Sequence, residues 1–310
     1  MALLEDGAWQ GKLWTGAWTD GSGGTYSAVE PATGESLGEV GKATAEDVHT
    51  AAVRAVEAQK TWAALPFEER AAVRRRAGDV LSANADEIKG WLARESGAIL
   101  PFGDFQVHTS AQECYEASAL PSHPYGELLR TGSPRLSFAR RIPAGVVGVI
   151  APFNVPTILA IRAVAPALAL GNAVILKPDP RTAISGGAMF ARVFAEAGLP
   201  AGVLQVLPGG ADVGEALVVE PAVRIIAFTG STRAGRVVGA LAGQHLKRAH
   251  LELGGNSALI VLGRRRRDGG GLGRRLGHLR PLRADLHGHF AAPGALLDRR
   301  GVHPDPHGEG

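Results

Sequence analysis

From about residue 143, the chain alternates between short apolar runs and longer segments with one apolar face. The run Val146–Ile150 is rich in β-branched residues, which is typical of a strand buried on both faces. The pattern predicts strands at 146–150, 173–176, 203–207, 225–228 and 258–261, and helices at 160–170, 185–197, 211–219 and 233–242. Residues 249–253 are expected to lead into the last strand. This alternation predicts an α/β fold with a doubly wound parallel sheet and helices on both faces.

The N-terminal part has a different pattern. Turn signals divide residues 1–41 into short strands. Thr44, followed three residues later by Asp47, predicts the N-cap of a helix that runs through Trp62. Further helices are expected from Pro66 to Leu81 and from Ala85 to Ser96.

Three consecutive arginines, Arg74-Arg75-Arg76, lie on the second of these helices. Because acidic residues accompany them on one amphipathic segment, we interpret them as a solvated face rather than as a basic patch. Cys114 is the only cysteine, so no disulfide can form within the chain. It has no histidine or basic residue within helical reach, and we therefore expect a structural thiol rather than a nucleophile.

The composition is that of a soluble globular protein. The 310 residues are 45% hydrophobic and 20% charged, enough for one or two domains. The net charge of +3 does not indicate a nucleic-acid partner. Glu5 and Asp6 interrupt the N-terminus, so we expect no signal peptide, and no apolar stretch is long enough to predict a membrane span. We expect a cytoplasmic protein that binds neither membrane nor nucleic acid.

Two segments depart from the α/β pattern. Residues 121–142 combine Pro, Gly and Ser with alternating apolar positions, which predicts a hairpin leaving the domain body. From residue 263 the alternation of strands and helices stops, and the last 48 residues contain ten arginines, five acidic residues and eleven glycines. This composition predicts an irregular, disordered tail. A basic nucleic-acid tail is the alternative, but Phe290 is its only aromatic residue.

Polar residues gather where the predicted strands end, which is where sheets of this kind bind ligands. Asn154 follows the first strand and fits either a turn or a hydrogen-bond donor to a developing oxyanion. Lys177 follows the second strand and fits either a surface charge or a contact to a ribose or phosphate. Gly230 and Ser231 open a helix whose N-terminus favours an anion. Glu252 precedes paired glycines, either as a satisfied turn residue or as a working carboxylate.

Four motifs at these strand ends, taken together and in this order, resemble the aldehyde dehydrogenase superfamily. They are Pro152-Phe153-Asn154, Leu176-Lys177-Pro178, Phe228-Thr229-Gly230-Ser231 and Leu251-Glu252-Leu253-Gly254-Gly255. The resemblance covers residues from about 10 to 262, and details within 162–172 and 207–214 look like the benzaldehyde dehydrogenase branch. It implies NAD(P)-dependent oxidation of a small-molecule aldehyde, aromatic in that branch, to the carboxylic acid.

The resemblance also implies residue roles. Asn154 matches the asparagine that stabilises the oxyanion, and Glu252 matches the general base that activates water. The implied cofactor-binding residues are Ile150, Phe153, Lys177, Gly209, Phe228, Thr229, Gly230, Ser231, Ala234, Leu253 and Gly254. Lys177 among them would contact the adenosine ribose, and Gly230 and Ser231 would lie beside the pyrophosphate. NAD is the expected cofactor and NADP the alternative, because Asp179 and Pro180 are both candidates for the position that selects the ribose 2′-hydroxyl. No metal is expected.

The family pattern divides the chain into five parts. These are N-terminal strands and helices of the cofactor domain (1–120), an oligomerisation-type hairpin (121–142), a dinucleotide-binding core (143–252), the start of a catalytic domain (253–262) and a non-family tail (263–310). Full-length members of the family form homo-oligomers, and the resemblance implies an assembly of this kind.

The family's nucleophile is a cysteine downstream of the glutamate, and this chain has none after Cys114. A shifted reading frame is one explanation. Codons compatible with residues 276–294, read from their second base, can encode a run containing Gln-Ile-Cys-Met, with the cysteine codon straddling Leu286 and His287. We hypothesise a one-base insertion, or its equivalent, just after Leu262, which would leave the chain without aldehyde oxidation. The competing hypothesis is a non-catalytic dinucleotide-binding or basic-tailed interaction protein.

Overall fold

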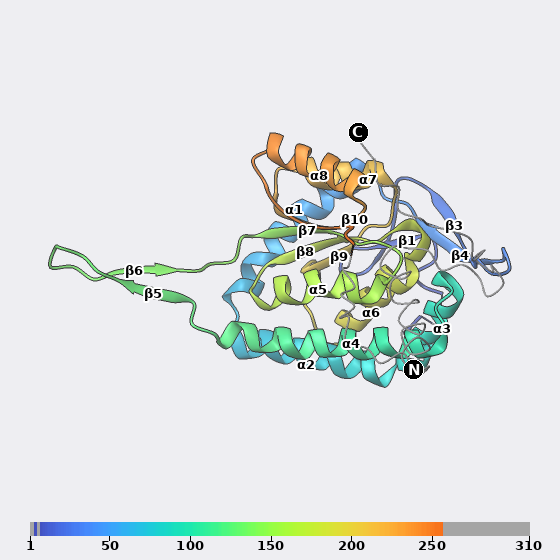
Figure 1. Cartoon of the computed structure of the whole chain (residues 1–310), viewed down its shortest axis with the longest axis horizontal. Coiled ribbons are helices and arrows are strands. Elements are labelled where there is room, and N and C mark those ends of the chain that lie inside the picture. The colour runs from blue at the N-terminus through green and yellow to red at the C-terminus, as the bar shows by residue number, and fades with distance from the viewer. Residues whose placement is uncertain (1–2, 5–6, 257–310) are drawn as a thin grey trace, which may run out of the picture. The chain divides into compact units, whose positions relative to one another are not determined.

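The computed structural model describes residues 3–4 and 7–256 (Figure 1). The described residues up to Gly255 form one compact unit. The predicted strand at 258–261, most of the predicted segment 253–262 and the predicted tail 263–310 lie outside the described residues.

Within residues 7–256, the largest sheet has seven strands in the order β11-β10-β7-β8-β9-β1-β2. Its parallel strands are β7 (Val146–Ile150), β8 (Ala173–Lys177), β9 (Leu204–Val206), β10 (Val223–Gly230) and β11 (Arg248–Leu253). From β7 the chain continues outward to β8 and β9, then returns to β10 on the other side. The α/β prediction is confirmed, and the order of strands places a topological switch point between β7 and β10, where such sheets bind ligands.

The sheet differs from the prediction at both edges. At one edge, β1 (Lys12–Trp14) and β2 (Trp18–Asp20) add antiparallel strands, so the sheet is mixed rather than purely parallel. At the other edge, residues 249–253 were expected as a lead-in, but they form β11 and pair with β10. The alternate residues Leu251 and Leu253 pack against α8 (Thr232–Gln244), where glycines leave room: a Cβ on Gly235 would lie 2.3 Å from the Leu253 side chain. Arg248, His250 and Glu252 alternate with the apolar residues Ala249, Leu251 and Leu253, which is the period-two pattern of a strand and could have predicted β11.

Helices cover both faces of the sheet (Figure 1). On one face lie α1 (Ala45–Ala64), α7 (Ala211–Val219) and α8, and on the other lie α5 (Pro156–Ala169) and α6 (Met189–Glu196). An outer layer on α5 and α6 consists of α2 (Phe67–Ala83), α3 (Ala85–Ser96) and α4 (Leu100–Ala119). The capping box predicted at Thr44 and Asp47 is present.

Smaller elements complete the described chain. A short antiparallel pair, β3 (Thr25–Val29) and β4 (Ser36–Gly41), follows β2. The predicted hairpin is formed by β5 (Gly126–Leu129) and β6 (Ser137–Arg140), and Figure 1 shows it extending from the rest of the unit. The short helices are η1 (Leu120–Ser122), η2 (Pro180–Thr182) and η3 (Ile184–Ala188), and η3 is a π-helical turn at the start of the helix predicted for 185–197.

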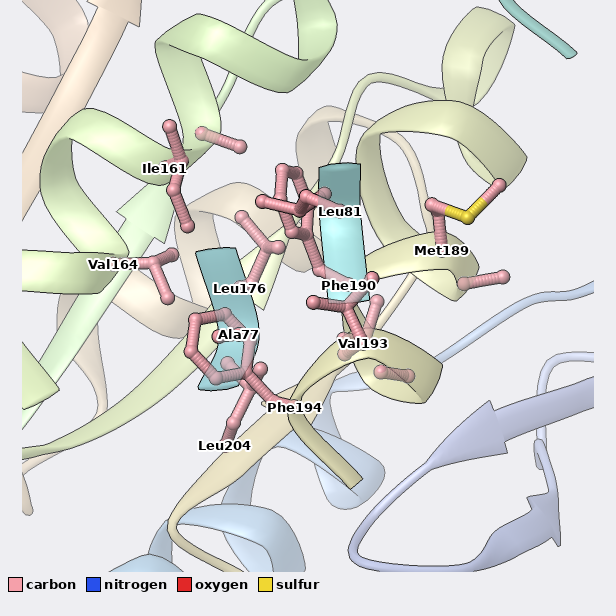
Figure 2. Close-up of a cluster of buried hydrophobic side chains, with 14 of the residues drawn as sticks. Ala77, Leu81, Ile161, Val164, Leu176, Met189, Phe190, Val193, Phe194 and Leu204 are labelled. Carbon is pink, nitrogen blue, oxygen red and sulfur yellow. The ribbon is translucent and has the colours of Figure 1, made fainter. Parts of the chain in front are cut away.

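The interior between β8, β9 and the α5–α6 layer is a continuous apolar cluster (Figure 2). Phe190 and Phe194 of α6 lie in it beside Leu176 and Leu204 from the sheet, and Ile161 and Val164 of α5 complete one side. Every one of these side chains is less than 3% exposed. This packing fixes β8, and with it the segment after Lys177, relative to the helices.

Arg74 contradicts the interpretation of the arginine cluster as a solvated face. Its side chain is fully buried, and its guanidinium lies over the rings of Trp62 (5.1 Å to the centroid) and Phe194 (5.3 Å). Burial lowers the pKa of Arg74 to about 9. Arg74 lies at helical spacing with Ala77 and Leu81, which belong to the buried face of α2, whereas Arg75 and Arg76 are exposed as predicted.

Glu95 is the other buried charge that shapes this region. It is 1% exposed, and its carboxylate accepts hydrogen bonds from the backbone N–H of Ile184 (2.8 Å) and from the N–H (2.6 Å) and hydroxyl (2.5 Å) of Ser185. These bonds hold the start of η3, which follows the loop after Lys177. Burial raises the pKa of Glu95 from 4.5 to about 7, although the hydrogen bonds from Ser185 oppose this shift.

We expect Glu95 to make the free energy of unfolding depend on pH. A carboxyl with a raised folded-state pKa binds its proton more tightly when folded, so its contribution is complete below about pH 4.5 and decreases as the pH rises to about 7. Urea unfolding at pH 5 and pH 8 should show a smaller difference for Glu95→Gln than for the unchanged chain. Glu116→Gln, an exposed carboxyl on α4, should leave the difference unchanged. An equal difference in all three proteins would contradict the assignment.

Candidate active site

The four motif segments meet at one edge of the sheet. Strands β7, β8, β10 and β11 are parallel, so their carboxyl ends point the same way. The register pairs Ile150 with both Lys177 and Phe228, and it pairs Thr229 with Glu252. Asn154 lies in the loop that leaves this edge after β7 and enters α5. Asn154 and Glu252 are therefore both placed at the carboxyl-terminal edge rather than on opposite sides of the sheet.

Lys177 is the last residue of β8, and its side chain is almost entirely buried, at 6% exposure. Gly214 of α7 lies against this side chain, and a Cβ there would make ordinary contact, 3.6 Å from Lys177 Cδ and 3.8 Å from Ile150 Cδ1. The ammonium donates to the carbonyl of Pro178 at 3.1 Å, which uses one of its three N–H bonds. Burial lowers the pKa of Lys177, and nearby Asp179 partly offsets this effect. The burial of this side chain contradicts the interpretation of Lys177 as a surface charge.

Beyond Lys177, the loop forms a charged pair that the sequence did not predict. Asp179 accepts hydrogen bonds from the backbone and guanidinium of Arg181, and this guanidinium lies 3.5 Å from the ring centroid of Phe153. Burial alone would raise the pKa of Asp179, but hydrogen bonds from Arg181 lower it overall. The contact of Arg181 with Phe153 joins the loops after β7 and β8. The only sign of the charged pair in the sequence was the close spacing of Asp179 and Arg181 on either side of Pro180.

The turn between β10 and α8 leads into the exposed N-terminus of a helix. Ser231 is the N-cap of α8, and its hydroxyl accepts from the backbone N–H of Ala234 at 3.2 Å. A Cβ on Gly230 would lie 2.6 Å from the Phe228 ring, so glycine is required for this turn to pack. The first turn of a 13-residue helix presents N–H groups and a partial positive charge to a ligand.

The remaining predicted cofactor residues flank this turn or the β9–α7 loop. Leu253 packs against the first turns of α8, and a Cβ on Gly254 would lie 3.7 Å from the Thr232 hydroxyl. Gly209 lies in the buried loop before α7, where a Cβ would lie 2.3 Å from Val213. The predicted residues thus lie at or just beyond the carboxyl ends of five neighbouring strands, β11, β10, β7, β8 and β9.

Glu252 is in the outermost of these strands, and its side chain is 65% exposed. Its carboxylate lies 3.1 Å from Nε2 of His250, two residues earlier on the same face of β11. The sequence interpretation did not consider His250, although its period-two spacing from Glu252 was visible. An exposed carboxylate beside an imidazole has access to water, as a base that activates water needs.

Cys114 lies elsewhere, within α4, and it is completely buried. Burial raises the pKa of its thiol to about 12, and the nearby Arg74 guanidinium offsets this only in part. The thiolate is the nucleophilic form of cysteine, so the prediction of a structural thiol is confirmed. The described residues contain no group of His, Cys, Asp and Glu suited to a metal ion. None of the helices in the described ranges is long and apolar enough to cross a membrane.

Comparison with known proteins agrees with this arrangement. The model of the aldehyde dehydrogenase family matches residues 18–267. This chain belongs to the aldehyde dehydrogenase family.

Several relatives within the family act on aromatic aldehydes according to their names. The chain is 65% identical to vanillin dehydrogenase of an Amycolatopsis species and 49% identical to benzaldehyde dehydrogenase [NAD(+)] of Pseudomonas putida. These alignments cover 84% and 83% of this chain, and 54% and 53% of the relatives. The chain therefore spans about half the length of the curated relatives it matches.

A solved structure gives the same result for the fold. The crystal structure of an NAD-dependent benzaldehyde dehydrogenase from Corynebacterium glutamicum superposes with a TM-score of 0.77 at 38% identity. The match covers 79% of this chain and 55% of that protein. The α/β architecture of the described residues is thus that of aldehyde dehydrogenases.

Proposed function

We propose that this chain is the cofactor-binding half of an NAD(P)-dependent aromatic aldehyde dehydrogenase. The observation that carries the proposal is the meeting of Asn154, Lys177, Ser231 and Glu252 at one edge of the sheet, beside the switch point between β7 and β10. The names of the relatives support an aromatic aldehyde as substrate. NAD is the cofactor favoured by those names, with NADP as the alternative.

The residues present fit a dinucleotide. The α8 N-terminus, with Ser231 as its cap, offers N–H groups to the pyrophosphate, and the buried Lys177 ammonium has N–H bonds left for the adenosine ribose. A Cβ would lie 2.3 Å from Val213 at Gly209 and 2.6 Å from Phe228 at Gly230, so these two glycines let the segments around the site pack closely. When bound, the oxidised cofactor supplies the acceptor for the hydride that leaves the aldehyde carbon.

The catalytic roles fall to residues at the same edge. The carboxamide of Asn154 would donate to the oxygen of the aldehyde as negative charge develops there. Glu252 would take a proton from the water that releases the acid, and His250, 3.1 Å away, would orient this carboxylate. The nucleophile would be a thiolate, and Cys114 does not fit that role because it is buried with a raised pKa.

We therefore expect the chain to bind NAD⁺ without oxidising benzaldehyde. The hypothesis of a shifted frame after Leu262 concerns residues outside the described ones. Calorimetric titration with NAD⁺ tests the expected binding. An absorbance assay for NADH tests separately whether benzaldehyde is oxidised. Failure of the chain to bind NAD⁺ at millimolar concentration would refute the proposed function, whereas thiol-dependent turnover would refute only the missing nucleophile. Binding without any turnover, even after the frame is changed, would favour a non-catalytic dinucleotide-binding protein.

Substitution of Lys177 is expected to weaken NAD⁺ binding by about 10- to 100-fold, the cost of losing a hydrogen bond from a charged donor. Lys177→Met keeps most of the buried stem and removes only the ammonium, so the loop should remain packed. Lys60→Met, which removes an exposed lysine from α1, is the matched control and should bind as the unchanged chain does. Equal dissociation constants for all three proteins would remove Lys177 from the site.

A further inference from the structure

Glu95 is a buried carboxylate that has no role in the proposed reaction, yet both of its oxygens are bonded to the segment that follows Lys177. It belongs to α3 and is 1% exposed. Oε1 accepts from the backbone N–H of Ile184 at 2.8 Å. Oε2 accepts from the backbone N–H of Ser185 at 2.6 Å and from its hydroxyl at 2.5 Å. Both oxygens thus serve as acceptors, as they do in an ionised carboxylate.

The helical turn that Glu95 holds packs against the residue that orients the Lys177 ammonium. Gly187 of η3 lies against Pro178, since a Cβ on Gly187 would lie 2.8 Å from Pro178 Cγ. The carbonyl of Pro178 accepts from the Lys177 ammonium at 3.1 Å. A series of direct contacts therefore runs from the Glu95 carboxylate through η3 and Pro178 to the ammonium proposed to bind the adenosine ribose.

Protonation of Glu95 would disturb the first of these contacts. A neutral carboxyl carries one O–H, and a hydrogen on Oε1 would face the N–H of Ile184. A hydrogen on Oε2 would turn the Ser185 hydroxyl from donor to acceptor and leave the Ser185 N–H with a weaker partner. Hydrogen bonds to an ionised carboxylate are the stronger ones, so the ionised form holds the start of η3 more firmly.

The surroundings of Glu95 place this change of charge near neutral pH. Burial raises the pKa of Glu95 to about 7; the hydrogen bonds from η3 oppose this shift, and the negative charge of Asp179 adds to it. The phenol of Tyr26 in β3 lies within electrostatic reach, and burial raises its pKa well above the usual range, so it stays neutral. Helix α4 also packs against α3, and its Asp104 is paired with Lys89, almost two turns before Glu95.

We propose that Glu95 is a positioning residue that links dinucleotide binding to its own ionisation. The ionised carboxylate holds η3 and Pro178 in the arrangement that sets the Lys177 ammonium, and the protonated carboxyl loosens it. The inference rests on the proposed function. Because the cofactor favours the ionised form, binding should release a proton, and the affinity should rise from pH 6 to pH 8.

Two other groups near the site would produce the opposite pH dependence. Burial lowers the pKa of Lys177, so loss of its proton would weaken binding as the pH rises. Protonation of His250 at the same edge would add positive charge and favour the pyrophosphate at low pH. A dissociation constant that falls as the pH rises is therefore the result expected of Glu95 and not of these two groups.

The test is calorimetric titration of the full chain with NAD⁺ at pH 6, 7 and 8, in two buffers of different ionisation enthalpy, which measures affinity and proton release together. The dissociation constant of the unchanged chain should fall about 3- to 10-fold from pH 6 to pH 8, with proton release near pH 7. Glu95→Gln places an amide N–H against a backbone donor at every pH. It should bind as weakly at pH 8 as the unchanged chain does at pH 6, and it should release no proton.

Ser185→Ala tests the inference independently, including the case in which Glu95→Gln does not fold, because it keeps the carboxylate and both backbone bonds. Loss of the hydroxyl donor should move the midpoint of the pH dependence to higher pH. Glu116→Gln, which changes an exposed carboxyl on α4, is the matched control and should follow the unchanged chain at each pH.

Equal affinity of the unchanged chain for NAD⁺ at pH 6 and pH 8 would overturn the inference and leave the proposed function standing. A pH dependence that survives in Glu95→Gln, or a midpoint that Ser185→Ala does not move, would also overturn it. A chain that binds no NAD⁺ at any of the three pH values would refute the proposed function itself.

Discussion

A one-base change of reading frame after Leu262 is expected to raise benzaldehyde oxidation by at least about 10³-fold over the chain as it stands, because removal of a catalytic nucleophile costs that much or more. The 310 residues contain one cysteine, and Cys114 is buried with a thiol pKa near 12. The alternative frame offers a cysteine codon across Leu286 and His287. That thiolate would supply the nucleophile to the proposed site of Asn154 and Glu252.

The measurement is NADH formation by the protein from the reframed gene, with benzaldehyde and vanillin as substrates. A second reframed gene with serine in place of the new cysteine is the control and should lose the gain, while its NAD⁺ affinity stays the same. Glu252→Gln in the reframed protein should leave the first turnover and slow the later ones, because the base acts on water after the hydride has left. The hypothesis is wrong if resequencing reveals no single-base change that opens a long frame, or if the reframed protein binds NAD⁺ without oxidising either aldehyde.

The central strands and the positions of the motifs were predictable from the sequence. Strands β7 and β8 are buried on both faces, so their apolar runs stand out, and the polar residue that follows each run is necessarily at the sheet edge. This is why Asn154 and Lys177 could be placed without coordinates. Helix α4 could not be predicted in the same way, because its buried face carries small or polar residues such as Gln106 and Ser110 instead of an apolar stripe.

What the sequence could not predict depends on contacts between distant segments. Arg181 reaches Phe153 only because β7 and β8 are neighbours, and Arg74 is buried only because Trp62 and Phe194 enclose it. In both cases an arginine lies against an aromatic ring. The stabilising contact is with a residue distant in the sequence, so no local pattern predicts it. Charge patterning alone assigns such residues to solvent, which is the error made for Arg74.

The largest loss of stability is expected from Trp62→Ala, at about 3–5 kcal/mol in the free energy of unfolding. Trp62 is fully buried at the end of α1, and its Nε1–H donates to the carbonyl of Leu168 in α5 at 2.8 Å. Its ring also lies against the Arg74 guanidinium, whose nitrogens have no hydrogen-bond partner among the described residues. Truncation would therefore leave a cavity and remove one of the two rings that shield a buried cation.

Two further variants separate these effects in urea unfolding. Trp62→Phe keeps a ring beside Arg74 but loses the hydrogen bond to Leu168, so most of the stability should remain, with a loss of about 1–2 kcal/mol. Val53→Ala removes methyl groups from an exposed position of α1, where the side chain is 52% exposed, and should change the free energy by less than about 0.5 kcal/mol. If Trp62→Phe were as destabilising as Trp62→Ala, the hydrogen bond to α5 would dominate. The ring over Arg74 would then contribute little to holding α1, α2 and α5 together.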